Sequence, residues 1–183
     1  MSQLRTHKKA ENRKLDAPLL AKPLRAGLPE PRRQAAALVF RTSGQCGLEI
    51  LLVNSRGTGR AVMPKGWLIA GEQGYQAAAR EAYEEAGIQG KIDRTPIGNY
   101  EYRKKRADQD ELVPVEVYPL KISRQRKKWP EQGCRKLRWL PPAEAANLVD
   151  EPMLAALIRW FTPANDQMMA EREVSLLTQG VRK

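Results

Sequence analysis

The chain has 183 residues, 42% of them hydrophobic, which suits one domain with tails and a core of proper size. Its 32 Lys and Arg against 21 Asp and Glu give a net charge of +11, which favours anionic partners. The one histidine, His7, lies in a polar stretch, which largely excludes Ser-His-Asp catalysis, Cys-His catalysis and His-ligated zinc. The two cysteines are too few for a disulfide framework. No apolar run resembles a signal or a membrane span, so we expect a cytoplasmic protein without a membrane partner.

The first stretch, residues 1–32, is rich in Lys, Arg, Ala and Pro and has no sustained hydrophobic periodicity. Its prolines would break any long helix. We expect a basic, flexible arm, which is either a solvated tail or a segment that contacts phosphates.

The next part of the chain predicts two strands and a helix. Residues 33–41 and 48–53 are rich in aliphatic side chains, which favour buried strands. A polar loop over residues 54–60 follows them. The alanines of residues 73–86 favour a helix, and Gly87 stands where a left-handed C-terminal cap would be expected.

Downstream, short strands and helices are expected to complete a mixed α/β domain. Strands are predicted over residues 95–102, 112–122 and 134–140, and helices over residues 143–148 and 153–161. The valines of the middle strand alternate with other residues, which is the period of a half-buried strand. A final amphipathic stretch, at about residues 166–177, favours a surface helix within the tail of residues 164–183.

The most informative stretch is a glycine-led motif, G-x5-E-x7-R-E-A-x-E-E-x-G-I, which begins at Gly66 and ends at Ile88. Its glutamates Glu81, Glu84 and Glu85 fall on one face of the predicted helix, because positions i, i+3 and i+4 lie together. Without a counter-charge, Glu81 and Glu85 would repel each other. Mg²⁺ prefers carboxylate oxygens, so the helix predicts a divalent-cation site, with Mn²⁺ as an alternative to Mg²⁺.

The spacing of this motif resembles the Nudix box of the Nudix hydrolases. The matching residues are Gly66, Glu72, Arg80, Glu81, Glu84, Glu85, Gly87 and Ile88. The resemblance implies a Nudix domain over residues 33–163, folded as an α/β/α sandwich with a mixed sheet. It also implies hydrolysis of phosphoanhydride bonds with Mg²⁺ as cofactor.

The glutamates of the motif are the expected catalytic residues. Glu81 and Glu85 are the expected metal ligands. Glu84 either binds metal or takes the proton of the attacking water, and Glu85 is the alternative general base. By the resemblance, the backbone carbonyl of Lys65 is a further metal ligand.

The remaining motif residues are expected to be structural, and they are Gly66, Glu72, Arg80 and Gly87. Arg80 lies one turn before Glu84 and can pair with it, which would hold the orientation of that carboxylate. For Glu72, a structural role and a metal role carry equal weight.

The flanks of the motif resemble the diphosphoinositol polyphosphate phosphohydrolases, and dinucleoside polyphosphate hydrolases share much of this likeness. It rests on Asn54-Ser55-Arg56, on MPKGW at residues 63–67 and on RKLRWL at residues 135–140. The implied phosphate contacts are Arg33, Ser55, Arg56, Lys65, Lys136, and either Arg103 or Lys104. Lys65 replaces the glycine usual in the inositol enzymes and is found in other polyphosphate-cleaving members, so both substrate classes stay open.

Other residues carry two interpretations each. Glu101 and Glu116 are expected to be strand-face charges, with a fourth metal ligand or a base as the alternative. For Trp67, Tyr100 and Tyr102 we expect packing, with stacking on a base as the alternative. Packing alone is expected for Trp129, Trp139 and Trp160.

The expected activity is Mg²⁺-dependent cleavage of a phosphoanhydride bond in a diphosphoinositol polyphosphate or a diadenosine polyphosphate. An RNA 5′-end pyrophosphohydrolase is one alternative, because the net charge of +11 fits RNA, although no RNA-binding motif is present and nucleic acid is the less favoured partner. A non-catalytic, nucleotide-binding Nudix module is the other, and the complete glutamate set argues against it. The sequence carries no signal for an oligomeric state.

Overall fold

The computed structural model describes residues 32–44, 47–105 and 110–163. The arm expected over residues 1–32, except Arg32, and the tail expected over residues 164–183 lie outside these ranges, and so does the predicted surface helix. In the described part of the chain, no helix combines the length and the apolar character needed to cross a bilayer.

The central strand of the one mixed sheet is β1 (Gln34–Ser43). It pairs antiparallel with β2 (Gly47–Asn54) and β4 (Lys65–Trp67), and parallel with β7 (Glu111–Gln125). Residues 35–39 of β1 are fully buried, because both faces of the sheet are covered at this strand. β1 therefore supports the motif, which runs from β4 into the following helix.

The other strands extend the sheet on both sides. Beyond β7 lie β5 (Ile88–Ile92) and β6 (Gly98–Lys104), and beyond β2 lie β3 (Ala61–Val62) and β8 (Leu137–Leu140), all antiparallel to their partners. The alternation expected over residues 112–122 is present, because every second residue from Val113 to Val117 is fully buried.

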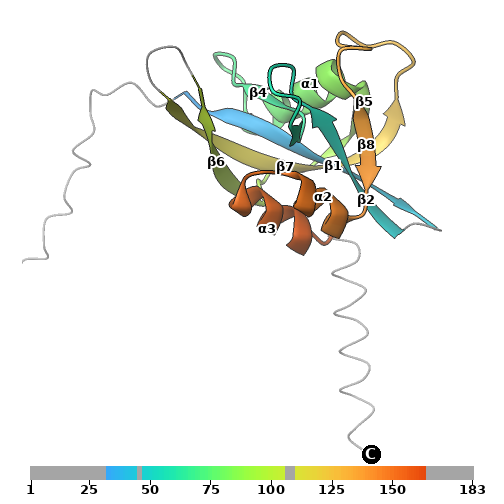
Figure 1. Ribbon diagram of the computed structural model, residues 1–183. Coiled ribbons are helices and arrows are strands. Elements are labelled where there is room, and N and C mark those ends of the chain that lie inside the picture. The colour runs from blue at the N-terminus through green and yellow to red at the C-terminus, as the bar shows by residue number, and fades with distance from the viewer. Residues whose placement is uncertain (1–31, 45–46, 106–109, 164–183) are drawn as a thin grey trace, which may run out of the picture. The chain divides into compact units, whose positions relative to one another are not determined.

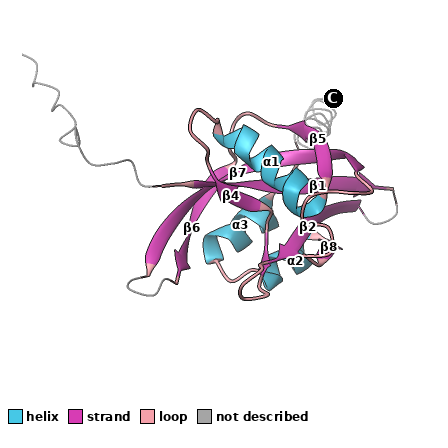
Figure 2. Ribbon diagram, turned by 90° about the horizontal axis from the view of Figure 1, so that it is seen from above, coloured by secondary structure: helices cyan, strands magenta, loops and turns pink. Residues whose placement is uncertain are grey.

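Among the described residues, three helices cover the two faces of the sheet. α1 (Gly74–Ala86) lies on one face, and α2 (Pro142–Leu148) and α3 (Pro152–Trp160) lie on the other (Figure 1). Seen from above, α1 lies over the central strands, where its small alanines allow close packing (Figure 2). On the opposite face, Leu154 and Ile158 of α3 are buried in the hydrophobic core between the sheet and the helices α2 and α3. The predicted α/β/α sandwich is confirmed.

Several local predictions differ from the structure. The strands β3, β4 and β5 were not predicted, because each is short, and β4 and β5 also carry polar residues. The last strand begins at Leu137, three residues later than expected, because turns occupy residues 130–134. The packing role expected for Trp160 is wrong, since 81% of its surface is exposed. Gly87 does adopt the left-handed conformation, with φ 70°, and its N–H caps the helix.

Candidate active site

The motif glutamates are positioned by a strand, a loop and a helix that all rest on β1. Gly66 in β4 pairs with Ala35 of β1, which fixes the loop that leads into α1. The Oε1 atom of Gln76 accepts a hydrogen bond from the Gln73 N–H at 2.9 Å, which ties the start of α1. Because the alanine face of α1 is buried against the sheet, the glutamates are presented at its edge, beside β4.

Gly66 leaves room for a carboxylate. A Cβ atom at this position would lie 2.0 Å from Oε1 of Glu81 and 2.2 Å from its Cδ, which no real contact permits. The Glu81 carboxylate therefore lies directly against the backbone of β4. This arrangement explains why the motif requires a glycine here, since a side chain would displace a predicted metal ligand.

Gly66→Ala is expected to leave the fold intact and to weaken divalent-metal binding by about tenfold or more. The clash involves only the flexible end of the Glu81 side chain, and Gly66 does not have a positive φ, so the backbone tolerates alanine. Mn²⁺ titration by calorimetry and thermal unfolding together test this expectation. Gly44→Ala is the matched control, because a Cβ there meets nothing within 4 Å. Wild-type metal affinity in Gly66→Ala would contradict the assigned role.

Arg80 is the centre of an ion-pair network beneath the site. Its Nε atom donates to Glu72 Oε1 at 3.0 Å, and its Nη1 atom donates to Glu81 at 2.6 Å and to Glu84 at 3.2 Å. Its Nη2 atom donates to the backbone carbonyl of Trp67 at 3.0 Å. The expected Arg80–Glu84 pair is present, but Glu84 is only one of the four partners of Arg80 among the described residues. Arg80 joins the loop, β4 and two of the glutamates into one unit.

The contacts of Glu72 favour the structural one of its two interpretations. Besides the Arg80 pair, its Oε2 atom accepts a hydrogen bond from the Ile69 N–H at 3.1 Å. The hydrogen bond from Arg80 lowers the pKa of Glu72, so the carboxylate is ionised and committed to that partner. Glu72 also does not line the cavity that contains the other glutamates.

Glu85 is the most deeply buried of the three helix glutamates. It is 5% exposed, and it accepts a hydrogen bond from Nη2 of Arg135 through Oε1. Its other oxygen, Oε2, is buried without a hydrogen-bond partner. Burial raises the pKa of Glu85 to about 7, although the nearby Arg135 opposes the rise. This buried oxygen is therefore available to bind a cation.

Arg135 lies in a segment far from α1 in the sequence, and its side chain contacts Glu85 at the site. Its Nε atom donates to Glu131 at 2.7 Å, and its Nη1 atom donates to the Asn54 carbonyl at 3.0 Å. The Glu131 N–H in turn donates to the Glu84 carbonyl at 3.0 Å. The segment between β7 and β8 is thereby fastened to α1. Sequence reasoning missed Arg135 and Glu131, and the only available signal was their i, i+4 spacing beside the RKLRWL run.

The glutamates border a cavity of about 420 Å³ that is also lined by basic and polar side chains. Its lining includes Glu81, Glu84, Glu85, Glu131, Ser55, Arg56, Lys65, Trp67, Lys104 and Arg135. Four of the predicted substrate contacts are among these residues: Ser55, Arg56, Lys65 and Lys104. The fourth carboxylate of the cavity is Glu131, rather than Glu101 or Glu116.

The other predicted contacts do not reach this cavity. Arg33 pairs with Glu116 at 2.9 Å and borders a separate cavity of about 280 Å³. Lys136 borders another, of about 210 Å³, together with Arg138. Arg103 is exposed, and because side chains alternate along a strand it points away from the face that carries Lys104.

Lys65 lines the cavity that contains the α1 glutamates. Its ammonium nitrogen lies 3.2 Å from Gln34 Oε1 and 4.2 Å from the centroid of the Tyr102 ring. Burial lowers the pKa of Lys65 to about 8, while the negative charge of Glu85 opposes this shift. Tyr100 and Tyr102 themselves are buried, which agrees with the packing interpretation for both.

The donor set suits a hard divalent cation. Three carboxylates of α1 face one cavity, Glu85 has an oxygen without a partner, and Gly66 makes room for Glu81. As placed among the described residues, no three acidic or other ligand side chains already converge on one point. Arg80 and Arg135 instead neutralise the carboxylates, so we expect small side-chain shifts when a cation binds.

Comparison with known proteins agrees with this geometry. The sequence model of the NUDIX domain matches residues 30–161. The chain belongs to the Nudix family. The resemblance expected from the motif is thereby confirmed, and with relatives that are named as hydrolases it supports the expected enzyme class, a pyrophosphohydrolase.

Relatives of this Nudix protein include plant and animal hydrolases. Nudix hydrolase 16, mitochondrial, of Arabidopsis thaliana is 33% identical over 132 residues, which cover 69% of this chain and 72% of that protein. Nudix hydrolase 12, mitochondrial, of the same plant is 37% identical over 105 residues, but this chain spans only 52% of its length. Diphosphoinositol polyphosphate phosphohydrolase 3-beta of Bos taurus is 32% identical over 121 residues, with 64% of this chain and 69% of that protein covered.

Solved structures of similar fold include two enzymes with phosphorylated substrates in their names. Dihydroneopterin triphosphate pyrophosphohydrolase of E. coli has a TM-score of 0.56 at 18% identity and covers 72% of this chain and 96% of its own. A binary complex of C. elegans Ap4A hydrolase has a TM-score of 0.53 at 23% identity, and the match covers 70% of this chain and 93% of that chain. At these identities the likeness establishes the Nudix fold alone.

Proposed function

We propose that this Nudix protein is a Mg²⁺-dependent hydrolase that cleaves a phosphoanhydride bond in a polyphosphorylated small molecule. The observation that carries the proposal is the composition of the cavity of about 420 Å³, where the α1 carboxylates lie in the same space as Arg56, Lys65 and Lys104. Carboxylates suit the cation, and several basic side chains suit a chain of phosphates. A diphosphoinositol polyphosphate and a diadenosine polyphosphate are the two substrate classes that we propose.

We assign different roles to the three α1 glutamates according to the exposure of their side chains. The Glu85 side chain is buried and engaged by Arg135, and Glu81 lies against β4, so these two are the proposed metal ligands. The Glu84 side chain is 38% exposed, the most accessible of the three, so it is the proposed general base. When bound, a divalent cation would neutralise charge on the diphosphate and activate water for attack.

The substrate class is tested by phosphate release from a panel of compounds with Mg²⁺. The panel contains diadenosine tetraphosphate, a diphosphoinositol polyphosphate and 5′-triphosphorylated RNA. We expect one of the first two compounds to be cleaved at least about tenfold faster than RNA, because the substrate must enter a cavity rather than lie on a surface. Preferred cleavage of RNA would favour the RNA-directed alternative. Binding without turnover of any compound would favour a non-catalytic module.

Metal affinity is expected to rise with pH through the titration of Glu85. A protonated carboxyl does not bind a cation, and burial raises the pKa of Glu85 to about 7. Below that pKa, affinity should therefore fall by up to about tenfold for each unit of pH. Mn²⁺ titrations by calorimetry near pH 6 and pH 8 measure the effect. Glu85→Gln should bind weakly at both pH values, and equal wild-type affinities would contradict the assignment.

The same titration affects stability in the opposite direction when no metal is present. The folded pKa lies above the value of about 4.3 expected for an unfolded Glu, so between these two values the folded state holds the additional proton. The Glu85 contribution to the free energy of unfolding is therefore fully present below about pH 4.3 and decreases as pH rises toward 7. Bound metal removes this decrease, because it stabilises the ionised form.

A further inference from the structure

The indole of Trp67 carries two cationic side chains at the edge of the catalytic cavity. The guanidinium carbon of Arg32 lies over the ring, 4.6 Å from its centroid, and the ammonium nitrogen of Lys104 lies over it at 5.1 Å. Trp67 and Lys104 also line the cavity that contains the α1 glutamates. One aromatic ring therefore gathers two positive charges beside the proposed site of cleavage.

Trp67 is a rigid support for these charges. It is the last residue of β4, where it pairs with Gln34 of β1, and its side chain packs against the core under α3. Its carbonyl accepts the hydrogen bond from Arg80. The ring is thus fixed to the same network that orients the glutamates, so the two cations have a defined place relative to them.

Within the part of the chain that the structure describes, the two cations differ from most nearby arginines in their ion pairing. Among residues 32–44, 47–105 and 110–163, no ion pair joins Arg32 or Lys104 to a carboxylate. By contrast, Arg33, Arg56, Arg60, Arg80 and Arg135 all pair with carboxylates. Like charges held near one ring repel each other, and a nearby anion offsets this repulsion.

We infer that Arg32, Trp67 and Lys104 form a second anion subsite, which binds a phosphate group beyond the bond that is cleaved. This inference rests on the proposed function and assigns residues to the phosphates that both proposed substrate classes carry beyond the cleaved diphosphate. It also argues against base stacking by Trp67, because cations already lie over the ring. The packing interpretation is retained, and support of the two cations is added to it.

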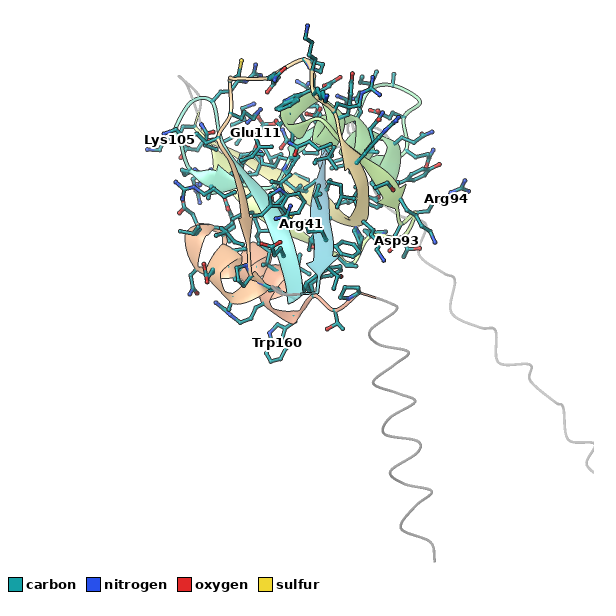
Figure 3. All side chains as sticks on the ribbon, turned by 90° about the vertical axis from the view of Figure 1, so that its right-hand side faces the viewer. Arg41, Asp93, Arg94, Lys105, Glu111 and Trp160 are labelled. Carbon is teal, nitrogen blue, oxygen red and sulfur yellow. The ribbon has the colours of Figure 1, made fainter. Side chains whose placement is uncertain are left out.

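The test measures binding in a chain that does not consume its ligand. Calorimetry of full-length Glu84→Gln with inorganic tetrapolyphosphate and with pyrophosphate separates distal from proximal phosphates. Arg32→Gln and Lys104→Gln, each added to that chain, should weaken tetrapolyphosphate binding by about fivefold to tenfold and change pyrophosphate binding by less than about twofold. Arg94→Gln is the matched control, because Arg94 lies over Tyr75 at 5.5 Å and sits across the domain from Lys105 (Figure 3).

A second comparison tests the role of the ring. Trp67→Leu should weaken the binding of adenosine tetraphosphate and of inorganic tetrapolyphosphate by the same factor, since the ring acts through the cations. Weaker binding of the nucleotide alone would overturn the inference, and so would wild-type tetrapolyphosphate affinity in Arg32→Gln and Lys104→Gln. If Trp67→Leu does not fold, these two variants still test the inference. Binding requires no turnover, so failure of the hydrolase proposal would be seen separately, in the substrate panel.

Discussion

Glu84→Gln is expected to lower kcat by about 10²- to 10⁴-fold while the protein stays folded. The amide retains the size of the side chain but accepts no proton, and Glu84 is the helix glutamate best exposed to the cavity. Its one ion pair, with Arg80 at 3.2 Å, is partly exposed, so its loss should cost less than about 1 kcal/mol of stability. Turnover and thermal unfolding of the same preparation separate the two effects.

Glu101→Gln is the matched control for that experiment. Glu101 is an exposed carboxylate on β6 and borders a different cavity from Glu84. Its variant should turn over at the wild-type rate. If Glu84→Gln also kept a rate within about twofold of wild type, Glu84 would have no part in the mechanism. Glu85 would then be the remaining candidate for the general base.

Arg80→Met is expected to lower the free energy of unfolding by about 2–3 kcal/mol in the absence of metal. The substitution leaves Glu72 and Glu81, whose side chains are only 14% and 13% exposed, without the cation between them. It also removes the donor to the Trp67 carbonyl. The estimate lies below the range for fully buried pairs, because the Arg80 side chain is itself 25% exposed. Urea unfolding measures the change.

Two further variants make the Arg80 result specific. Arg124→Met removes an exposed arginine whose side chain donates to Gln89, and it should change stability by less than about 0.5 kcal/mol. Arg80→Lys keeps the charge but loses the planar fork, so it should recover only part of the loss. Equal stability of Arg80→Met and Arg124→Met would show that the network does not support the fold.

The elements with strong local signals were predictable from the sequence. Residues 35–39 are buried on both faces, so their strand appears as a continuous aliphatic run, and the alanines of α1 favour a helix independently of context. β4 and β5 lack such signals. The three residues of β4 become a strand only because they pair with Gln34–Ala36 of β1, about thirty residues earlier in the chain.

The same distinction between local sequence signals and long-range pairing applies to the candidate site. Glu81, Glu84 and Glu85 could be placed together because helical spacing is a local property. Arg135 could not, since it reaches Glu85 across 50 residues of chain, through a loop that carries no periodic pattern. The choice between Arg103 and Lys104 depended on the register of β6 against β7, which decides which residue faces inward. Short-range pattern identified the candidate ligands, and tertiary pairing identified their neighbours.

The central proposal, that the α1 carboxylates hold a cation needed for phosphoanhydride cleavage, is tested most directly by metal-dependent turnover. The measurement is phosphate release from the best substrate of the panel, first in chelator, then with Mg²⁺ restored, in wild type and in Glu81→Gln/Glu85→Gln. We predict no release in chelator, full release with Mg²⁺, and a loss of at least about 10³-fold in the double variant at any Mg²⁺ concentration. Full turnover in chelator, or wild-type turnover in the double variant, would contradict the proposal.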